Sequence, residues 1–487
     1  MKTKIYILLL GFLFLGLLKG EAQFSRYWGE SFSTKSALLS GAVVGGYQDE
    51  SSIYYNPSIL SDSSMNQFSF ANGVLNIDYL RYENAIGDRM DVSTLESSVT
   101  AGFLSANLYP KDKFQLVWKA AYFNRAKFDH SLEDDVKEEY DVVKDFPGEE
   151  LYIGSVSTRS EFNDYWYGIG IAKFVNENLS FGLSGFLRYT SLRYHFTKSI
   201  EISAISADTN QRIALANDIT SSRGYNWRGT VKLGANYRFS KNVSGGMTIT
   251  SPSMYFASSI SGSRNISRIN NPDPNDTGVL PDYFYDATGE KMKLNVRDPL
   301  SIAVGVDYRL EKLRWNLTTE WFAGLKPYKV IDQTDGDVNV LKTAYFPEFE
   351  TEVLSFVSGG KSIVNIAVGV EIYNKKNRSM MFGFKTDFDA LKDFNYGDLN
   401  DLDKFKNSRS HYYHFSAGKS FQFLKYDVLF GLQYSISRQK GMLALANFTP
   451  SKSMEGFEPY QLEGPLKNNM SFKGDDLTVF LGLTIKD

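Results

Sequence analysis

Two of the four histidines, His411 and His414, are three residues apart, a spacing that suggests a shared metal ion. They lie in a segment whose residues alternate between apolar and polar, as in a β-strand, where side chains three residues apart point to opposite faces. We therefore predict no metal site. The chain has no cysteine, which excludes disulfides, thiol catalysis and cysteine-bound metal centres, and no cofactor is predicted.

Catalytic motifs are missing from the sequence. It contains no Gly-x-Ser-x-Gly turn, no phosphate-binding loop and no zinc-protease motif. His195 has no obvious partner that would complete a catalytic set. Two acidic runs, 332–337 and 398–403, carry oxygen ligands suited to calcium, but neither matches a complete calcium loop, so solvated turns are favoured. We predict that the protein is not an enzyme, and a net charge of -3 gives no indication of a nucleic-acid partner.

Charged residues recur at every second position of long alternating segments. Between Tyr225 and Phe239 the odd-numbered residues are mostly apolar, whereas the even-numbered ones are mostly polar. In a membrane barrel the polar face lines the lumen. The favoured interpretation of the lumen charges is an ion-pair network that holds a plug, and the alternative is that Arg228 or Lys232 receives an acidic headgroup. Strand parity predicts twelve lumen-facing charges: Lys119, Arg125, Arg188, Arg228, Lys232, Arg238, Asp307, Arg309, Arg314, Glu320, Glu371 and Lys385. The proposed site charges among them are Arg188, Arg228, Lys232, Arg238 and Glu320.

The connections between the alternating segments decide the fold. Short turns and long polar loops alternate strictly along the chain, which is typical of outer-membrane barrels with an even strand number. We predict an all-β fold: a transmembrane antiparallel β-barrel of about 14 strands. The predicted strands are 66–82, 97–109, 113–128, 161–175, 178–203, 225–239, 242–260, 290–310, 312–329, 361–373, 378–388, 409–423, 425–440 and 475–486.

The first residues have the pattern of a cleavable signal peptide. Lys2 and Lys4 precede an apolar stretch over 5–18, and small residues at Gly20 and Ala22 place the cleavage before Gln23. The apolar stretch is shorter than the roughly 20 residues of a membrane-spanning helix. We expect export through this signal and insertion into the outer membrane.

The residues before the first strand are expected to fold into the lumen as a plug. They are partly apolar, and Asn56-Pro57 is a turn signal. Ile53, Tyr54 and Tyr55 would be poorly placed in free solution. The predicted division is therefore a signal peptide over 1–22, a plug over 23–64 and the fourteen-stranded barrel over 65–487. The residues proposed to form the plug site are Asp49, Ser52, Ile53, Tyr54, Tyr55, Asn56, Pro57 and Leu60.

The pattern Asp-x-x-Ser-x-Tyr-Tyr-Asn-Pro-x-x-Leu over 49–60 resembles the hatch motif of the FadL family of outer-membrane transporters. The stretches 246–253 and 298–308 resemble other parts of that family. The resemblance implies a plugged barrel in which ligand enters from outside, meets the plug and leaves sideways near a kinked third strand. The third predicted strand, 113–128, contains no proline or glycine that would force such a kink.

The resemblance implies uptake of hydrophobic small molecules such as long-chain fatty acids. The alternative is a barrel of the same family, similar to PorV, that acts as a non-transporting subunit of a protein secretion or assembly complex. The expected partners are outer-membrane lipid, a hydrophobic small-molecule ligand and, in the alternative, other outer-membrane or secretion-machinery proteins.

Overall fold

Antiparallel β-sheet makes up almost all the regular structure of the computed structural model. Short helical segments precede the first strand: α2 (Thr34–Leu38), α3 (Ser52–Tyr55) and the 3-10 turn η2 (Pro57–Ser61); a further 3-10 turn is η3 (Gln333–Asp335). The expected signal peptide lies outside the described residues. The structure describes residues 26–29, 32–48, 50–61, 68–98, 102–109, 116–142, 148–205, 212–270, 281–343, 352–374, 378–391, 410–423, 426–449 and 462–485.

The strands differ greatly in length. Those of the first half of the chain are β1 (Phe68–Glu83), β2 (Val92–Ser98), β3 (Phe103–Tyr109), β4 (Val117–Tyr140), β5 (Glu150–Phe174), β6 (Leu179–Ala204), β7 (Arg212–Arg238), β8 (Val243–Thr250), β9 (Met254–Ile269) and β10 (Tyr283–Leu294). Those of the second half are β11 (Ser301–Arg309), β12 (Leu313–Phe322), β13 (Leu325–Asp332), β14 (Asp337–Lys342), β15 (Phe356–Gly360), β16 (Ile363–Asn374), β17 (Arg378–Asp387), β18 (Tyr412–Phe423), β19 (Tyr426–Met442) and β20 (Met470–Ile485).

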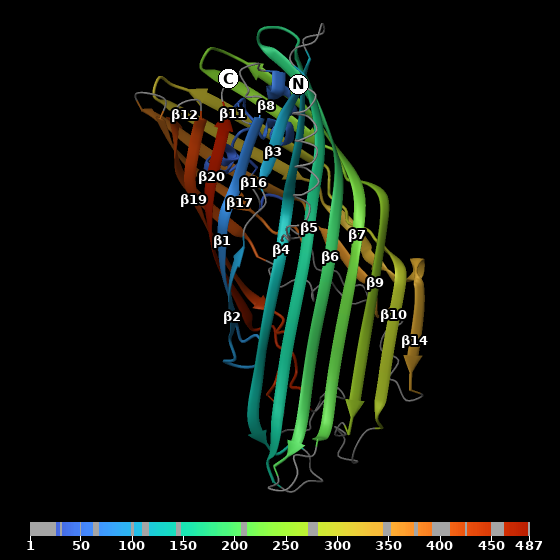
Figure 1. The fold of residues 1–487 in the computed structure, drawn as a ribbon. Coiled ribbons are helices and arrows are strands. Elements are labelled where there is room, and N and C mark those ends of the chain that lie inside the picture. The colour runs from blue at the N-terminus through green and yellow to red at the C-terminus, as the bar shows by residue number, and fades with distance from the viewer. Residues whose placement is uncertain are drawn as a thin grey trace.

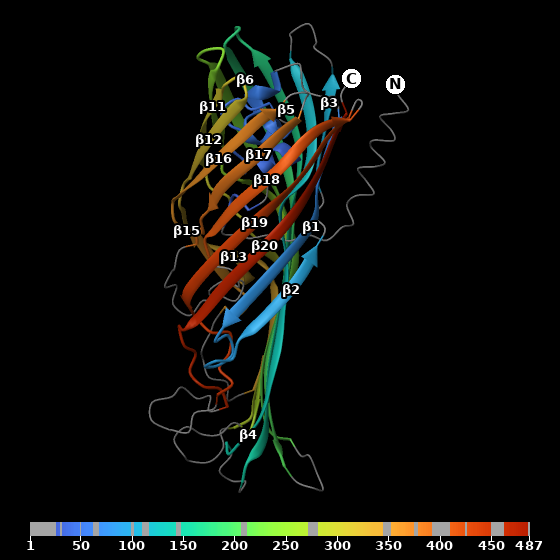
Figure 2. The same ribbon diagram turned by 90° about the vertical axis from the view of Figure 1, so that its left-hand side faces the viewer.

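The pairings of the described strands form one antiparallel wall. Pairing runs from β1 through β3 to β8, then through β11, β12 and β16 to β20. β20 pairs in turn with β1 over fifteen residue pairs. The wall surrounds α2, α3 and η2 (Figures 1 and 2). This is the antiparallel β-barrel architecture that the sequence predicts, with both faces of each strand exposed to different surroundings.

The long strands reach far beyond the rest of the barrel at the end that carries the long loops. β7 has 27 residues, which at a rise of about 3.3 Å per residue is about 90 Å, whereas a tilted strand needs only about 10 residues to cross a membrane. β4 to β7, β9 and β10 form this projecting sheet (Figure 1). We call this end the long-loop end and the opposite one the short-turn end.

Several predicted boundaries are wrong for this reason. Much of the expected loops 129–160, 204–224 and 261–289 belongs to β4, β5, β7, β9 and β10. The outer part of β4 is dense in acidic residues and lacks an apolar stripe, so its own pattern resembles a loop, and pairing with β5 holds it as a strand. The predicted strands 242–260, 290–310 and 312–329 are each broken, the first at Pro252, where a ladder donor is missing.

The outward face of the barrel carries an apolar band bounded by tyrosines. Aliphatic side chains such as Leu183, Leu187 and Leu233 are exposed there, as expected only where lipid covers them. Towards the long-loop end the band stops at a row of stacked rings with centroids 6.2–6.4 Å apart, which we call the tyrosine row. Tyrosine rings gather at membrane–water interfaces because one end is apolar and the other is polar. The tyrosine row consists of Tyr122, Tyr165, Tyr189 and Tyr225.

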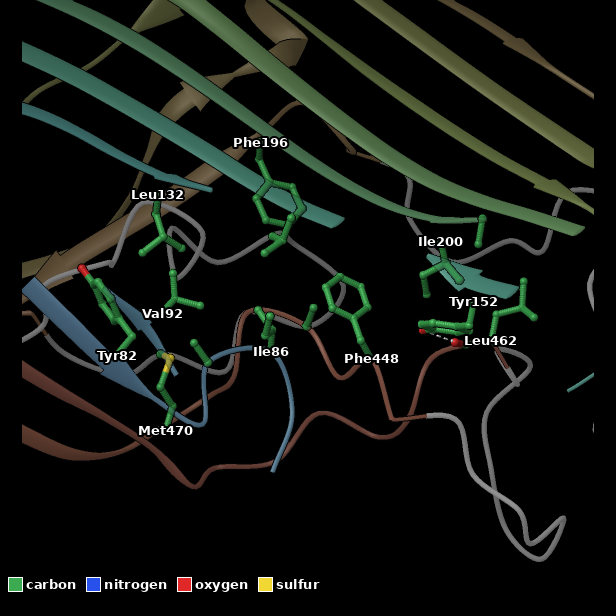
Figure 3. Packing of buried hydrophobic residues seen from close by; sticks show 14 of the residues in the cluster. Tyr82, Ile86, Val92, Leu132, Tyr152, Phe196, Ile200, Phe448, Leu462 and Met470 are labelled. Carbon is green, nitrogen blue, oxygen red and sulfur yellow. Dashed lines mark hydrogen bonds between the residues drawn. The ribbon is translucent and has the colours of Figure 1, made fainter. Parts of the chain in front are cut away.

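A structured segment lies against the inner face of the projecting sheet. Residues 84–91, 443–449 and 462–469 form this outer strap, which joins the β1–β2 and β19–β20 connections to β5 and β6 (Figure 3). The Phe448 ring packs directly on Gly154, and the Tyr152 hydroxyl donates to the Leu462 carbonyl oxygen at 2.8 Å. Lys198 Nζ and Glu463 Oε2 form an ion pair at 2.6 Å. The strap therefore buries the apolar inner face of the projecting strands.

Candidate functional site

The described part of the plug consists of residues 32–48 and 50–61 and occupies the barrel near the short-turn end (Figures 1 and 2). α2 lies against β17 to β20, whereas η2 lies against β4 to β7. The plug therefore touches both sides of the wall. Of the proposed plug-site residues, Asp49 lies outside the described residues. Ser52, Ile53, Asn56, Pro57 and Leu60 are buried, and Tyr54 and Tyr55 are half-buried.

Asn56 makes four hydrogen bonds through its side chain. Its Nδ2 donates to the Val44 carbonyl oxygen at 2.9 Å and to the Ala235 carbonyl oxygen of β7 at 3.2 Å. Its Oδ1 accepts from the backbone N–H and the hydroxyl of Ser58, at 3.2 and 2.7 Å. The Asn-Pro turn is therefore a clamp between the two parts of the plug and the barrel wall.

Replacing Asn56 tests this clamp. Asn56→Ala is expected to lower the free energy of unfolding by about 1–3 kcal/mol, because buried backbone carbonyls lose their donor. Asn56→Asp should lose at least as much, since a carboxylate cannot donate to Val44 and Ala235. Urea unfolding of the refolded barrel in detergent micelles would measure both. An Asn56→Asp protein as stable as the wild type would contradict the clamp.

Glycines on the inner wall let the plug backbone approach the strands closely. A Cβ atom added at Gly246 of β8 would overlap the Val44 carbonyl oxygen, and one added at Gly182 of β6 would overlap the backbone of Pro57. Only glycine permits such close backbone contact. We call these positions the glycine belt; its other members are Gly234, Gly305, Gly369, Gly383, Gly418 and Gly431.

Aromatic side chains cluster where the plug meets β4, β5 and β6. Tyr54 lies at ring-centroid distances of 4.5 Å from Phe32, 5.6 Å from Phe123 and 5.5 Å from Trp166. Lys232 Nζ lies 3.9 Å from the centroid of the Tyr54 ring, which is a cation–π distance. The cluster therefore combines packed aromatic rings with one cationic group at its edge. Its remaining aromatic members are Tyr55, Phe103 and Phe186.

A buried charged cluster adjoins these aromatic rings. Arg188 Nη2 lies 2.6 Å from Asp164 Oδ2, and its Nη1 lies 2.7 Å from Asp298 Oδ2. Arg228 contacts the same two carboxylates at 3.1 Å each. Arg125 Nη1 lies 3.7 Å from Asp298 Oδ1, and its Nε donates to the Tyr54 hydroxyl at 3.3 Å. Three arginines thus share two aspartates beside the plug.

The other predicted lumen charges are dispersed. Glu320 accepts from the Trp28 indole N–H at 2.6 Å and from the Ser301 hydroxyl at 2.6 Å. Arg238 is exposed at the short-turn end of β7 and does not belong to the cluster. Three further charges that strand parity places in the lumen also bind the plug region: Lys119 pairs with Glu50, Arg314 Nη2 donates to the Gly46 carbonyl oxygen, and Lys385 Nζ donates to the Trp28 carbonyl oxygen.

The described residues of β2 (Val92–Ser98) lie beside β4 without a backbone pairing between the two strands. Among the described residues, β4 pairs with β3 only from Trp118 to Tyr122, and beyond that point only with β5. There β2 approaches β4 through side chains: His130 Nδ1 lies 3.2 Å from Glu96 Oε1, and the Ser131 N–H donates to the same oxygen at 2.9 Å. Between the described residues of β2 and β4, contact is therefore made by side chains and not by a backbone ladder, and we call this place the pairing gap of β4.

A bulge at Arg125 distorts β4 next to the gap. The register against β5 shifts between Asn124 and Ala126, so Arg125 is an extra residue on its strand. A bulge bends a strand and re-aims side chains without proline or glycine, and here the Arg125 side chain reaches Tyr54 and the Tyr27 carbonyl oxygen. The third predicted strand is thus irregular, although no residue in it forces a kink.

Sequence reasoning missed the two aspartates of the charged cluster. Asp164 also accepts from the Trp166 indole N–H at 2.8 Å and from the Thr190 hydroxyl at 3.0 Å. Asp298 lies in the connection between β10 and β11, where strand parity cannot say which way a side chain points. The signal available was the unpaired excess of arginine at the predicted lumen face, which requires nearby carboxylates.

No helix in the described part of the chain has the length and apolar character needed to cross a membrane. No protein-family profile matches the sequence, and no curated protein matches it.

Solved structures give the class of fold. A Pseudomonas aeruginosa FadL homologue is similar with a TM-score of 0.54 and 11% identity, over 95% of this chain and 100% of that one. The Pseudomonas putida toluene transporter TodX is similar with a TM-score of 0.51 and 12% identity, over 94% and 98%. The fold is therefore that of an outer-membrane β-barrel with a plug in its lumen. Within that class it is the FadL-type fold, as the sequence resemblance implies.

Proposed function

We propose that the protein takes up hydrophobic small molecules across the outer membrane. The observation that carries this proposal is the aromatic cluster, which contacts the plug on one side and adjoins the pairing gap of β4 on the other. The plug contacts opposite sides of the wall, so a straight route along the barrel axis is obstructed. A ligand would instead pass from the aromatic rings to the gap and leave sideways into the membrane. The FadL-type fold supports the same route.

Lys232 is the residue that we propose for an acidic headgroup. Arg228 already contacts Asp164, Asp298 and Thr190. Lys232 has no ion pair among the described residues and rests on the Tyr54 ring. Its charge is therefore available to a ligand that lies on the aromatic cluster. Long-chain fatty acids combine an apolar chain with such a headgroup and are the acidic ligands that we propose.

Uptake by cells that lack their own channel of this kind tests two proposals: that the protein takes up hydrophobic molecules, and that Lys232 binds an acidic headgroup. Expression should raise the initial uptake rate of a labelled long-chain acid and of a neutral hydrocarbon above that of vector-only cells. Lys232→Gln should reduce uptake of the acid about tenfold, because a charge-assisted contact contributes on the order of 1.5 kcal/mol, while uptake of the hydrocarbon stays unchanged. If neither compound exceeds the vector-only rate, uptake is excluded. If the Lys232→Gln variant takes up both the acid and the hydrocarbon more slowly, Lys232 does not bind the headgroup.

A second candidate function is that of a subunit in a protein secretion or assembly complex. The observation that favours it is the projecting sheet, which extends well beyond the apolar band and offers a polar outward face. Native purification in mild detergent followed by mass spectrometry separates the two functions. A stoichiometric apolar ligand without a protein partner would support uptake. A stoichiometric protein partner with no apolar ligand would favour the complex.

A further inference from the structure

The inner face of β6 is covered by successive layers between the plug and the long-loop end. Phe186 belongs to the aromatic cluster and Arg188 to the charged cluster. Leu192 packs in an apolar cluster with residues of β10, β13 and β15, and Phe196 packs against the outer strap. These side chains share one face because their numbers have the same parity. A molecule that approaches the aromatic cluster along this wall from the long-loop end therefore meets two packed layers first.

The layer at Leu192 comes from the connection between β12 and β16. Residues 325–342 and 352–360 of this connection form β13, η3, β14 and β15, and we call them the outer lid. Phe356 of the lid is buried, and its ring centroid lies 6.4 Å from that of Tyr194 on β6. In the wall, β7, β8 and β11 stand between β6 and β12. The lid therefore bridges from one part of the wall to another across the inside.

The outer lid lies just beyond the rim of the closed wall. β8 ends its pairing with β7 at Thr250, which is opposite Lys232. Lys232 contacts the Tyr54 ring, so the aromatic cluster lies directly inside this rim. Ile260 packs in the same apolar cluster as the lid, and it is opposite Gly224, further along β7 towards the long-loop end. The lid is thus placed between the long-loop end and the aromatic cluster.

Few backbone contacts hold the lid in this position. β14 pairs with β10 over six residue pairs and β13 pairs with β10 over two, whereas β5 and β6 pair over twenty-five. Among the described residues β14 has a strand on one side only, at the edge of the projecting sheet (Figure 1). Segments with few backbone pairings open at a lower free energy than the strands of a continuous sheet. The lid can therefore separate while the wall stays intact.

The lid also has the build of a unit that moves about one base. A Cβ atom added at Gly324, where the lid begins, would lie 3.0 Å from the carbonyl oxygen of Gly360, where it ends. Within the lid, Lys329 Nζ lies 3.1 Å from Asp332 Oδ1 and 2.7 Å from Glu352 Oε2, which joins β13 to the residues before β15. Both ends thus leave the wall side by side, as in a hinged segment.

We propose that the outer lid is a gate for apolar ligands, an inference that rests on the proposed uptake function. The lid covers the mouth in the structure, and it separates from β10 and β6 to admit a ligand to the aromatic cluster. A ligand opens a gate only if it binds the open state better than the closed one. Separation exposes apolar side chains such as Val330, Leu354 and Phe356, which an apolar molecule covers and a polar solute does not. The gate therefore responds to the class of molecule that the barrel transports.

A reversible cross-link between the lid and β10 tests the gate, because the chain has no cysteine of its own. Thr288 of β10 and Asn339 of β14 are exposed and lie directly opposite each other, at a separation that a disulfide can span. Cells that express Thr288→Cys/Asn339→Cys in its oxidised form should take up a neutral hydrocarbon at the vector-only rate. Reduction with dithiothreitol should restore the wild-type rate. Full uptake by the oxidised protein would overturn the gate.

The matched control is Lys440→Cys/Ser471→Cys, which joins two opposite residues of the wall strands β19 and β20. Its oxidised form should take up the hydrocarbon at the wild-type rate. Loss of uptake in this control as well would overturn the proposal, because a cross-link anywhere would then be enough.

Hydrogen exchange in detergent micelles tests the gate without uptake. In the reduced Thr288→Cys/Asn339→Cys protein the amides of β13 and β14 should exchange faster than those of β5 and β6, and oxidation should slow them. Equal exchange in the oxidised and reduced forms would overturn the gate even where the wild type takes up the hydrocarbon. A wild type without uptake, in which oxidation still slows this exchange, would instead overturn the proposed function and leave the lid as a mobile segment.

Discussion

Gly246→Val is expected to unseat the plug and turn the barrel into an ion-conducting pore. The Val44 carbonyl oxygen occupies the space that any side chain at this position would need, and the Asn56 amide also borders it. Both belong to the plug, which cannot move aside locally because Val44 N–H donates to Thr318 at 3.3 Å and Asn56 holds Val44. Overpacking that flexible side chains can absorb costs about 1–3 kcal/mol. Here the added side chain would overlap the backbone of the plug, so the overlap can be removed only by displacing the plug.

Conductance of single barrels in planar bilayers is the measurement. We expect the wild type to conduct little and Gly246→Val to conduct on the order of ten times more, since a large barrel without a plug encloses a channel. The control is Gly185→Val on β6, where an added Cβ meets nothing within 4 Å and the same residue types are exchanged. Heat-modifiable gel mobility confirms that both variants fold. A Gly246→Val barrel that conducts no more than Gly185→Val would show that the glycine belt does not seat the plug.

The glycine belt shows what sequence patterns can predict and where they fail. Alternation along residues 225–239 predicts a strand and its polar face, and the structure places Arg228 and Lys232 on the inner face. Alternation cannot tell whether a glycine such as Gly246 lies under plug backbone or in open space, because that depends on a segment about 200 residues earlier in the chain. The hydrogen bond from Asn56 to the Ala235 carbonyl oxygen also joins residues far apart in the chain, so strand alternation cannot predict it.

The charged cluster illustrates the second kind of failure. Arg188 and Arg228 are directly opposite each other in the register of β6 and β7, so strand parity is enough to bring them together on the inner face. Their partner Asp298 comes from an irregular connection, and Arg125 reaches the cluster through a bulge. Irregular connections and bulges lack the alternation of apolar and polar residues by which a strand is recognised in a sequence. Regular strands therefore supply Arg188, Arg228 and Asp164, whereas irregular backbone supplies Arg125 and Asp298.

Asp298→Asn is expected to cause the largest loss of stability of any single substitution in the cluster. Asp298 accepts from Arg188 at 2.7 Å and contacts Arg228 at 3.1 Å and Arg125 at 3.7 Å. The neutral amide leaves three buried arginines with one carboxylate, Asp164. Removing one partner of a buried ion pair typically costs about 3–5 kcal/mol, because the remaining charge stays buried without compensation. The midpoint of urea unfolding in detergent micelles, at an unchanged slope, measures the loss.

Two further variants decide whether charge balance is the cause. Asp88→Asn removes the exposed carboxylate that pairs with Lys467 at 2.5 Å in the outer strap, and it should leave the midpoint unchanged because water screens that pair. Asp298→Asn combined with Arg228→Gln removes one charge of each sign, and it should lose less stability than the sum of the two single variants, since the two sites interact directly. Strict additivity would mean that Asp298 stabilises the barrel through its position in the β10–β11 connection and not through its charge. Recovery in the double variant would instead identify the shared carboxylates as the reason why three arginines can be buried beside the plug.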